Sequence, residues 1–175
     1  VTIETIVLQL VQALAWVYRN AALYGGDPQR IVVVGHSAGG HLAAMLLSCA
    51  WPAVAADLPA RLVAGALSIS GLFDLEALRQ TPFLQADLRL TPGWVRRLSP
   101  ARFAAPAGPL NAAVGADESE EFQRQTRLIR ERWGESAVPV CETIPGAHHF
   151  SVLDDFIDPH GRLHGLALRL LGLAV

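Results

Sequence analysis

The chain has 175 residues, of which 51% are hydrophobic and 17% are charged, and its formal net charge at pH 7 is −2. This length suffices for one domain with a buried core, and the small negative charge gives no reason to expect nucleic-acid binding. Because no uninterrupted apolar run approaches the roughly 20 residues that span a bilayer, we also expect no membrane partner.

Two cysteines, Cys49 and Cys141, fall in a predicted helix and a predicted strand that lie far apart in the sequence. We expect free thiols rather than a disulfide, which favours a reducing, cytoplasmic location. The first residues, Val1 to Glu4, resemble neither a signal peptide nor a natural start, since they contain no Met and no basic segment.

Residues 3–24 predict a long amphipathic helix, because apolar side chains recur there at helical spacing. Gly25-Gly26-Asp27-Pro28 is expected to end this helix. The β-branched run Ile31 to Val34 then predicts a strand that is buried on both faces.

The next pentapeptide, Gly35-His36-Ser37-Ala38-Gly39, matches G-x-S-x-G and leads into a predicted helix that ends near residue 50. Between a strand and a helix, this motif is typical of a nucleophile elbow, a strained turn that holds the serine hydroxyl above the sheet. We expect side chains at Gly35 and Gly39 to collide with neighbouring backbone. The alternatives are a serine that only caps the helix and a phosphate-binding loop, which is disfavoured because no Lys-Ser/Thr pair follows the glycines.

Strands and helices alternate along the rest of the chain. We expect a helix start capped by Asp74 and, at about 80–109, an excursion of short helices and loops that forms a pocket wall. The other expected elements are a surface loop at 51–61, strands at 62–69, 110–114 and 138–144, a loop at 145–150, and helices at 119–133 and 163–173. This alternation predicts a three-layer α/β/α fold around a parallel sheet of about four strands.

Candidate catalytic residues follow three of the four predicted strands. Ser37 comes after the first, Asp117 and Glu118 after the third, and His148 and His149 after the fourth. The carboxyl ends of parallel strands share one edge, and the order Ser, acid, His is that of α/β-hydrolases. A serine needs such a base and such an acid to act as a nucleophile at neutral pH. Each residue alone also fits a helix cap or an exposed loop.

Four segments together resemble one family: Gly-His-Ser-Ala-Gly-Gly-His-Leu-Ala-Ala-Met, Ser-Gly-Leu-Phe-Asp-Leu, Glu-Ser-x-Glu-Phe-x-Arg-Gln and Gly-Ala-His-His-Phe-Ser-Val-Leu. They look like the α/β-hydrolase family of kynurenine formamidases (arylformamidases) and related carboxylesterases, and the similarity covers nearly the whole chain. The resemblance implies hydrolysis of N-formylkynurenine to kynurenine and formate, a step of tryptophan catabolism, without a metal ion or organic cofactor.

Carried over to this sequence, the resemblance assigns Ser37 as the nucleophile and His149 as the base. It assigns Glu118 as the acid, with Asp117 as the alternate. The backbone N–H of Ala38 is the one obvious donor to an oxyanion.

The sequence departs from the family at its front, where about four further strands and a His-Gly-Gly segment are expected. We therefore expect residues 1–175 to form a single α/β-hydrolase domain that is incomplete at the N-terminus, with the first strand as an unpaired edge. Two alternatives stay open: a general carboxylesterase of unknown substrate, and a non-catalytic hydrolase-fold fragment or interaction module. A homodimer stays open as well.

Overall fold

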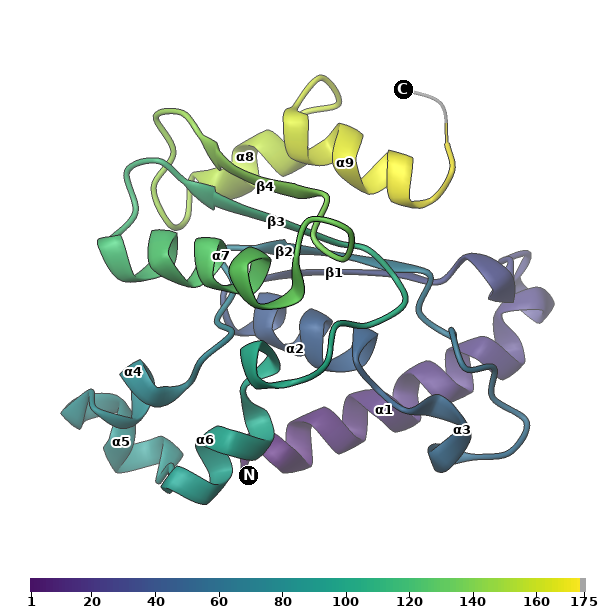
Figure 1. The fold of residues 1–175 in the computed structure, drawn as a ribbon. Helices are drawn as coiled ribbons and strands as arrows, with labels where there is room; N and C mark the ends of the chain where they lie inside the picture. Colours follow the sequence, from purple (N-terminus) through teal and green to yellow (C-terminus); the bar gives the residue numbers. More distant parts are fainter. Residues whose placement is uncertain (174–175) are drawn as a thin grey trace.

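A parallel four-stranded sheet in the order β1-β2-β3-β4 forms the centre of the computed structural model, which describes residues 1–173 (Figure 1). The strands are Val32–His36 (β1), Gly65–Ile69 (β2), Leu110–Gly115 (β3) and Val140–Ile144 (β4). Each neighbouring pair is parallel, so helices on the two faces connect the strands. The predicted α/β class is thereby confirmed, and the expected last two residues of the 1–175 domain lie outside the described part.

The helices form layers on both faces of the sheet. They are α1 (Ile3–Asn20), α2 (Ala38–Leu47), α3 (Trp51–Val54), α4 (Glu76–Arg79), α5 (Pro82–Leu88), α6 (Pro92–Leu98), α7 (Glu120–Trp133), α8 (Val152–Ile157) and α9 (Arg162–Leu170). Helices α1, α2 and α7 lie on one face, and α8 and α9 lie on the other (Figure 1). The short helices α4 to α6 gather at the lower left of Figure 1, and α5 and α6 fall within the excursion expected at about 80–109.

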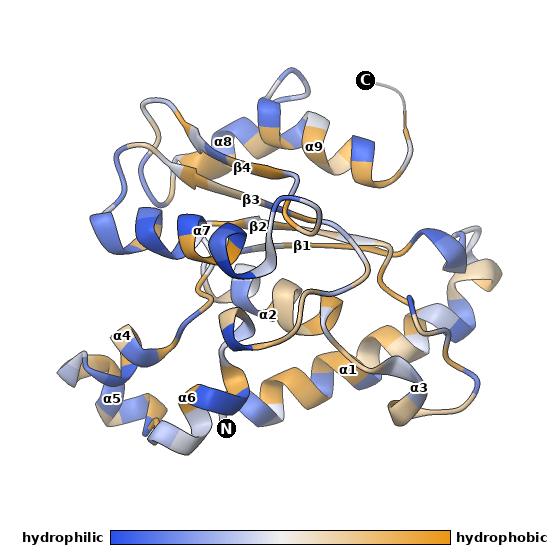
Figure 2. Ribbon diagram, viewed as in Figure 1, coloured by the Kyte–Doolittle hydropathy of each residue, from blue (hydrophilic) through white to orange (hydrophobic). Residues whose placement is uncertain are grey.

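Alternate side chains of the buried strands supply two separate hydrophobic cores. In β2, Ala66 packs into the core beneath α1 and α2, whereas Leu67 and Ile69 pack into the core beneath α8 and α9. All five residues of β2 are buried, as expected for a strand covered on both faces. Figure 2 shows these strands mostly in the hydrophobic colour, while α7 carries hydrophilic residues along much of its length.

The first strand differs from its prediction. Within residues 1–173, β1 is hydrogen-bonded to β2 alone and forms an edge of the sheet. Val34 is 41% exposed as a result, so the expectation of a strand buried on both faces is wrong for β1. The expectation of an apolar edge strand is met instead.

Residues 51–61 were expected to form a surface loop, and this prediction is wrong for their hydrophobic members. Trp51 begins the short helix α3 and is 1% exposed, and Leu58 is 3% exposed. Both side chains belong to the core that α1 and α2 share. A four-residue helix has too few residues to show periodicity, so its burial was not visible in the sequence.

Helix α1 is amphipathic as predicted, but the described residues cover only one side of it. Val11 and Ala15 are buried against the core, whereas Leu8 and Trp16 are 57% and 54% exposed. By length and composition alone, the segment Ile3–Tyr24 is apolar enough to cross a bilayer, a property that buried core helices of soluble proteins and signal sequences share.

Glycines permit the close packing of β1 against α2. A Cβ built on Gly35 would lie 2.0 Å from the backbone oxygen of Gly39, so the expected collision is present there. A Cβ on Gly39 would meet nothing within 4 Å, and the collision expected at that position is absent. The next residue, Gly40, is the constrained one, because its Cβ would lie 2.8 Å from the Cα of Gly71.

We predict that His41 makes the stability of the fold depend on pH. This side chain is 4% exposed in α2, and its Nε2–H donates to the carbonyl oxygen of Leu98 at 2.7 Å. Burial lowers the pKa of His41 below its usual value of 6.5, since a charged imidazole would lose its hydration. The unfolded chain therefore takes up the proton first as the pH falls, and the free energy of unfolding decreases below about pH 6.5.

The measurement is urea unfolding of the wild type and of His41→Gln between pH 4 and 8, since glutamine keeps a donor for Leu98. We expect the wild type to lose up to about 1.4 kcal/mol more per pH unit than the variant below about pH 6.5. Parallel stability curves for the two proteins would contradict this account.

Candidate active site

Ser37 occupies the sharp turn between β1 and α2. Its φ of 55° lies in the left-handed region, which is unfavourable for a residue with a side chain. The turn is held by a hydrogen bond from the Ser37 N–H to the carbonyl oxygen of Ile69 at 2.9 Å. The Ser37 side chain makes no capping bond to α2, so the helix-cap alternative does not describe it.

The hydroxyl of Ser37 is instead hydrogen-bonded to His149, which follows β4. The Ser37 Oγ lies 3.0 Å from His149 Nε2, and His149 Nδ1 lies 2.6 Å from Glu118 Oε2. Because an ionised carboxylate only accepts, Nδ1–H is the donor to Glu118 and Nε2 is free to accept from the serine. The structure thus brings Ser37, His149 and Glu118 into one hydrogen-bonded chain.

The two alternate residues lie elsewhere. Asp117 is exposed, and its backbone N–H donates to the carbonyl oxygen of Ala147. His148 is exposed too, and its Nδ1 accepts from the backbone N–H groups of Phe150 and Ser151 at 3.2 Å each. His148 therefore stabilises its own loop and does not contact Ser37.

The acid and the base of this hydrogen-bonded chain differ in their exposure to solvent. The Glu118 side chain is 0% exposed, and its Oε1 accepts from Ser70 Oγ at 2.5 Å and from the Gly115 N–H at 2.8 Å. The His149 side chain is 25% exposed, which leaves a path from solvent to the base. Gly115 is needed for this arrangement, because a Cβ there would lie 2.2 Å from the carbonyl oxygen of Ala147.

Two further side chains pack against the imidazole of His149, and neither was predicted from the sequence. The Phe122 ring lies 4.4 Å from the imidazole centroid, and the His36 ring lies 4.5 Å from it. His36 Nε2–H also donates to the carbonyl oxygen of His149 at 2.7 Å. His36 lies in the G-x-S-x-G motif and Phe122 in the Glu-Ser-x-Glu-Phe segment, so the sequence marked both segments as relevant to the site. Only the tertiary structure shows that these two side chains contact His149.

The backbone N–H of Ala38 has no intrahelical acceptor, because Ala38 is the first residue of α2. An N–H in that position, at the positive end of a helix next to Ser37, favours negative charge.

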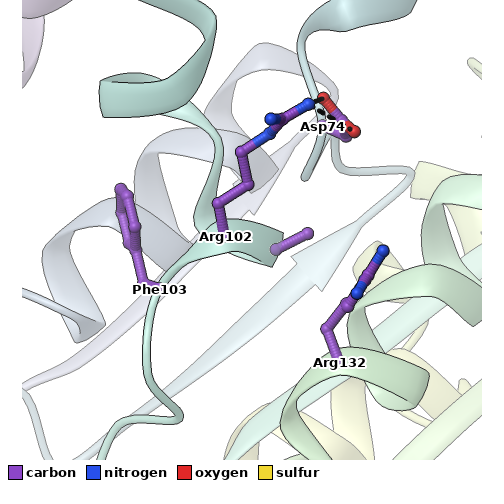
Figure 3. Close-up of a pocket in the computed structure, with 5 residues that line it drawn as sticks. Asp74, Arg102, Phe103 and Arg132 are labelled. Carbon is purple, nitrogen blue, oxygen red and sulfur yellow. Dashed lines mark hydrogen bonds and ion pairs between the residues drawn. The ribbon is translucent and has the colours of Figure 1, made fainter.

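A surface cavity of about 460 Å³ lies apart from these residues (Figure 3). Asp74, Ala101, Arg102, Phe103 and Arg132 line it, and none of the three hydrogen-bonded residues does. Arg102 reaches across the cavity to the carboxylate of Asp74 at 3.3 Å. Asp74 also accepts from the backbone N–H of Glu76 at 3.1 Å, the contact expected at the start of α4.

No group of three His, Cys, Asp or Glu side chains within residues 1–173 is arranged to hold a metal ion. Cys49 and Cys141 are free thiols, as expected, and burial raises the pKa of both. Neither cysteine is therefore primed as a nucleophile at neutral pH.

A parallel sheet with helices on both faces and a serine on a strained strand-to-helix turn defines the α/β-hydrolase class. The sequence profile of the carboxylesterase family matches residues 7–83. A kynurenine formamidase of Danio rerio is 30% identical over 149 residues, which cover 81% of this chain and 50% of that protein. The esterase LipQ of Mycobacterium tuberculosis is 30% identical over 161 residues, covering 82% of this chain and 38% of the relative.

Solved structures of esterases have a similar fold. A propionate-bound esterase of Thermogutta terrifontis has a TM-score of 0.62 and 28% identity, covering 98% of this chain and 63% of its own. A carboxylesterase of Lactobacillus plantarum has a TM-score of 0.70 at 20% identity, and the match covers 97% of this chain and 69% of that structure. The chain has the α/β-hydrolase fold, and its sequence is similar to kynurenine formamidases and carboxylesterases. It spans about half the length of the kynurenine formamidases that it matches.

Proposed function

We propose that this chain carries the catalytic residues of a serine hydrolase that cleaves an ester or aryl formamide bond. The observation that supports this most is the chain of two hydrogen bonds from Ser37 through His149 to the buried carboxylate of Glu118. Relatives named as formamidases and esterases support the same class of reaction.

In the proposed reaction, Ser37 Oγ attacks the carbonyl carbon of the substrate while its proton moves to His149 Nε2. Glu118 accepts the Nδ1–H bond and stabilises the imidazolium that forms. The Ala38 N–H donates to the developing oxyanion, a contribution that is typically worth about 100- to 1000-fold in rate. His149 then protonates the leaving amine or alcohol, which departs and leaves Ser37 acylated or formylated.

Water completes the cycle. His149 takes a proton from a water molecule, the water oxygen attacks the acyl carbon, and the proton returns to Ser37 Oγ as the acid departs. With a formamide such as N-formylkynurenine, the two products are kynurenine, which is the free aryl amine, and formate. No step requires a metal ion or an organic cofactor.

We infer that residues 1–175 form one domain of this enzyme and that it acts in the cytoplasm on a small-molecule substrate of tryptophan catabolism. The two free thiols support a reducing compartment, and the kynurenine formamidase relatives support this substrate.

The choice between the two acids is tested by Glu118→Gln and Asp117→Asn. We expect Glu118→Gln to lower kcat by about 10⁴-fold, because an amide cannot hold the same tautomer of His149. Asp117→Asn should retain activity within about twofold, because its side chain is exposed and the proposed mechanism does not use it. Loss of activity in Asp117→Asn alone would assign the acid to Asp117.

The reaction itself is tested with a fluorophosphonate probe and two substrate classes. We expect the probe to add to Ser37, as read by peptide mass, and Ser37→Ala to lose about 10⁶-fold in kcat. Hydrolysis of N-formylkynurenine with a higher kcat/KM than p-nitrophenyl acetate supports the formamidase, and the reverse order supports the general carboxylesterase. A protein that neither reacts with the probe nor turns over either substrate would be the non-catalytic module.

A further inference from the structure

Ser70, the residue after β2, has an unfavourable backbone conformation. Its φ of 52° lies in the left-handed region, which among the non-glycine residues of the described chain it shares with Ser37 and Arg89. Glycine would adopt this conformation without strain. Ser70 is 0% exposed, so solvent does not explain a serine at this position. Such strain at a buried residue points to a role for its side chain.

The Ser70 hydroxyl bonds to the acid of the proposed catalytic chain. Its Oγ donates to Glu118 Oε1 at 2.5 Å, and the Gly115 N–H donates to the same oxygen at 2.8 Å. The other oxygen, Oε2, accepts from His149 Nδ1 at 2.6 Å. Two donors on Oε1 fix the plane of the carboxylate, so that Oε2 faces the imidazole.

A second buried serine, which lies within β2 itself, offers a matched comparison. Ser68 lies two residues earlier in β2 and is also 0% exposed. Its Oγ has no hydrogen-bond partner in the part of the chain that the structure describes. Of these two buried serines, only Ser70 has a hydroxyl that is hydrogen-bonded to Glu118.

We propose that Ser70 is a positioning residue of the hydrolytic site: its hydroxyl holds the Glu118 carboxylate in the orientation that orients and polarises His149. This inference rests on the proposed function and deepens it. The strained backbone is retained because glycine, which would relieve it, lacks the hydroxyl. Ser70 does not touch the reacting atoms and acts through Glu118 and His149.

The experiment compares Ser70→Ala, Ser70→Gly and the control Ser68→Ala in the protein. We measure kcat, KM and the thermal unfolding midpoint. Proton NMR records the far-downfield resonance of the His149 Nδ1–H, the signature of an imidazole bonded to a carboxylate. We expect both Ser70 variants to lose about 10- to 100-fold in kcat, with KM changed by less than about threefold. The expected loss equals that seen when a residue that hydrogen-bonds to a metal ligand, and so orients it, is removed. Their downfield resonance should broaden or disappear, and Ser68→Ala should keep both properties.

Two results would overturn the inference. One is a wild-type kcat in Ser70→Gly, which would mean that catalysis needs the backbone conformation at this position but not the hydroxyl. The other is a resonance in Ser70→Ala that equals that of Ser68→Ala. If Ser70→Ala does not fold, Ser70→Gly decides, because it removes the hydroxyl and the strain together. Failure of the proposed function is distinguishable, because the wild type would then lack turnover while the resonance still reports whether Ser70 orients the pair.

Discussion

The buried carboxylate of Glu118 is the group on which the site depends. Its side chain has no exposed surface, and a carboxylate in that position is stable only when its oxygens accept hydrogen bonds. Its three donors, Gly115, Ser70 and His149, follow or end strands β3, β2 and β4. Since His149 is also bonded to Ser37 after β1, one hydrogen-bonded network connects the carboxyl ends of all four strands.

This network requires the strands to be parallel and close together, which the small residues permit. Gly35 and Gly40 allow β1, α2 and the segment after β2 to approach at backbone distance, and Gly115 does the same for the loop that carries His149. A Cβ at any of these positions would lie closer than 3.0 Å to a backbone atom, and at Gly40 it would also lie 2.6 Å from the Oγ of Ser68. The elbow glycine Gly39 has no such constraint, so the motif's two glycines are not equivalent in this chain.

Much of the fold could be predicted from the sequence, because β-branched runs and helical periodicity are local properties. The order of strands and helices, the elbow and the identity of the three linked residues all followed from such patterns and from the family resemblance. The exposure of Val34 and the burial of Trp51 did not, since each depends on which segment packs against it. The contacts of Ser70 and His36 could not be predicted from the sequence for the same reason. Their partners, Glu118 and His149, lie 48 and 113 residues away along the chain.

The central claim is that His149 activates Ser37, and the rate at which a fluorophosphonate modifies Ser37 tests it most directly. The measurement is the second-order rate constant for the wild type, for His149→Gln and for the neighbouring control His148→Gln. The account predicts a decrease of at least about 100-fold for His149→Gln, the usual size of a general-base contribution, with the control close to the wild type. Equal rates for the wild type and His149→Gln would contradict it.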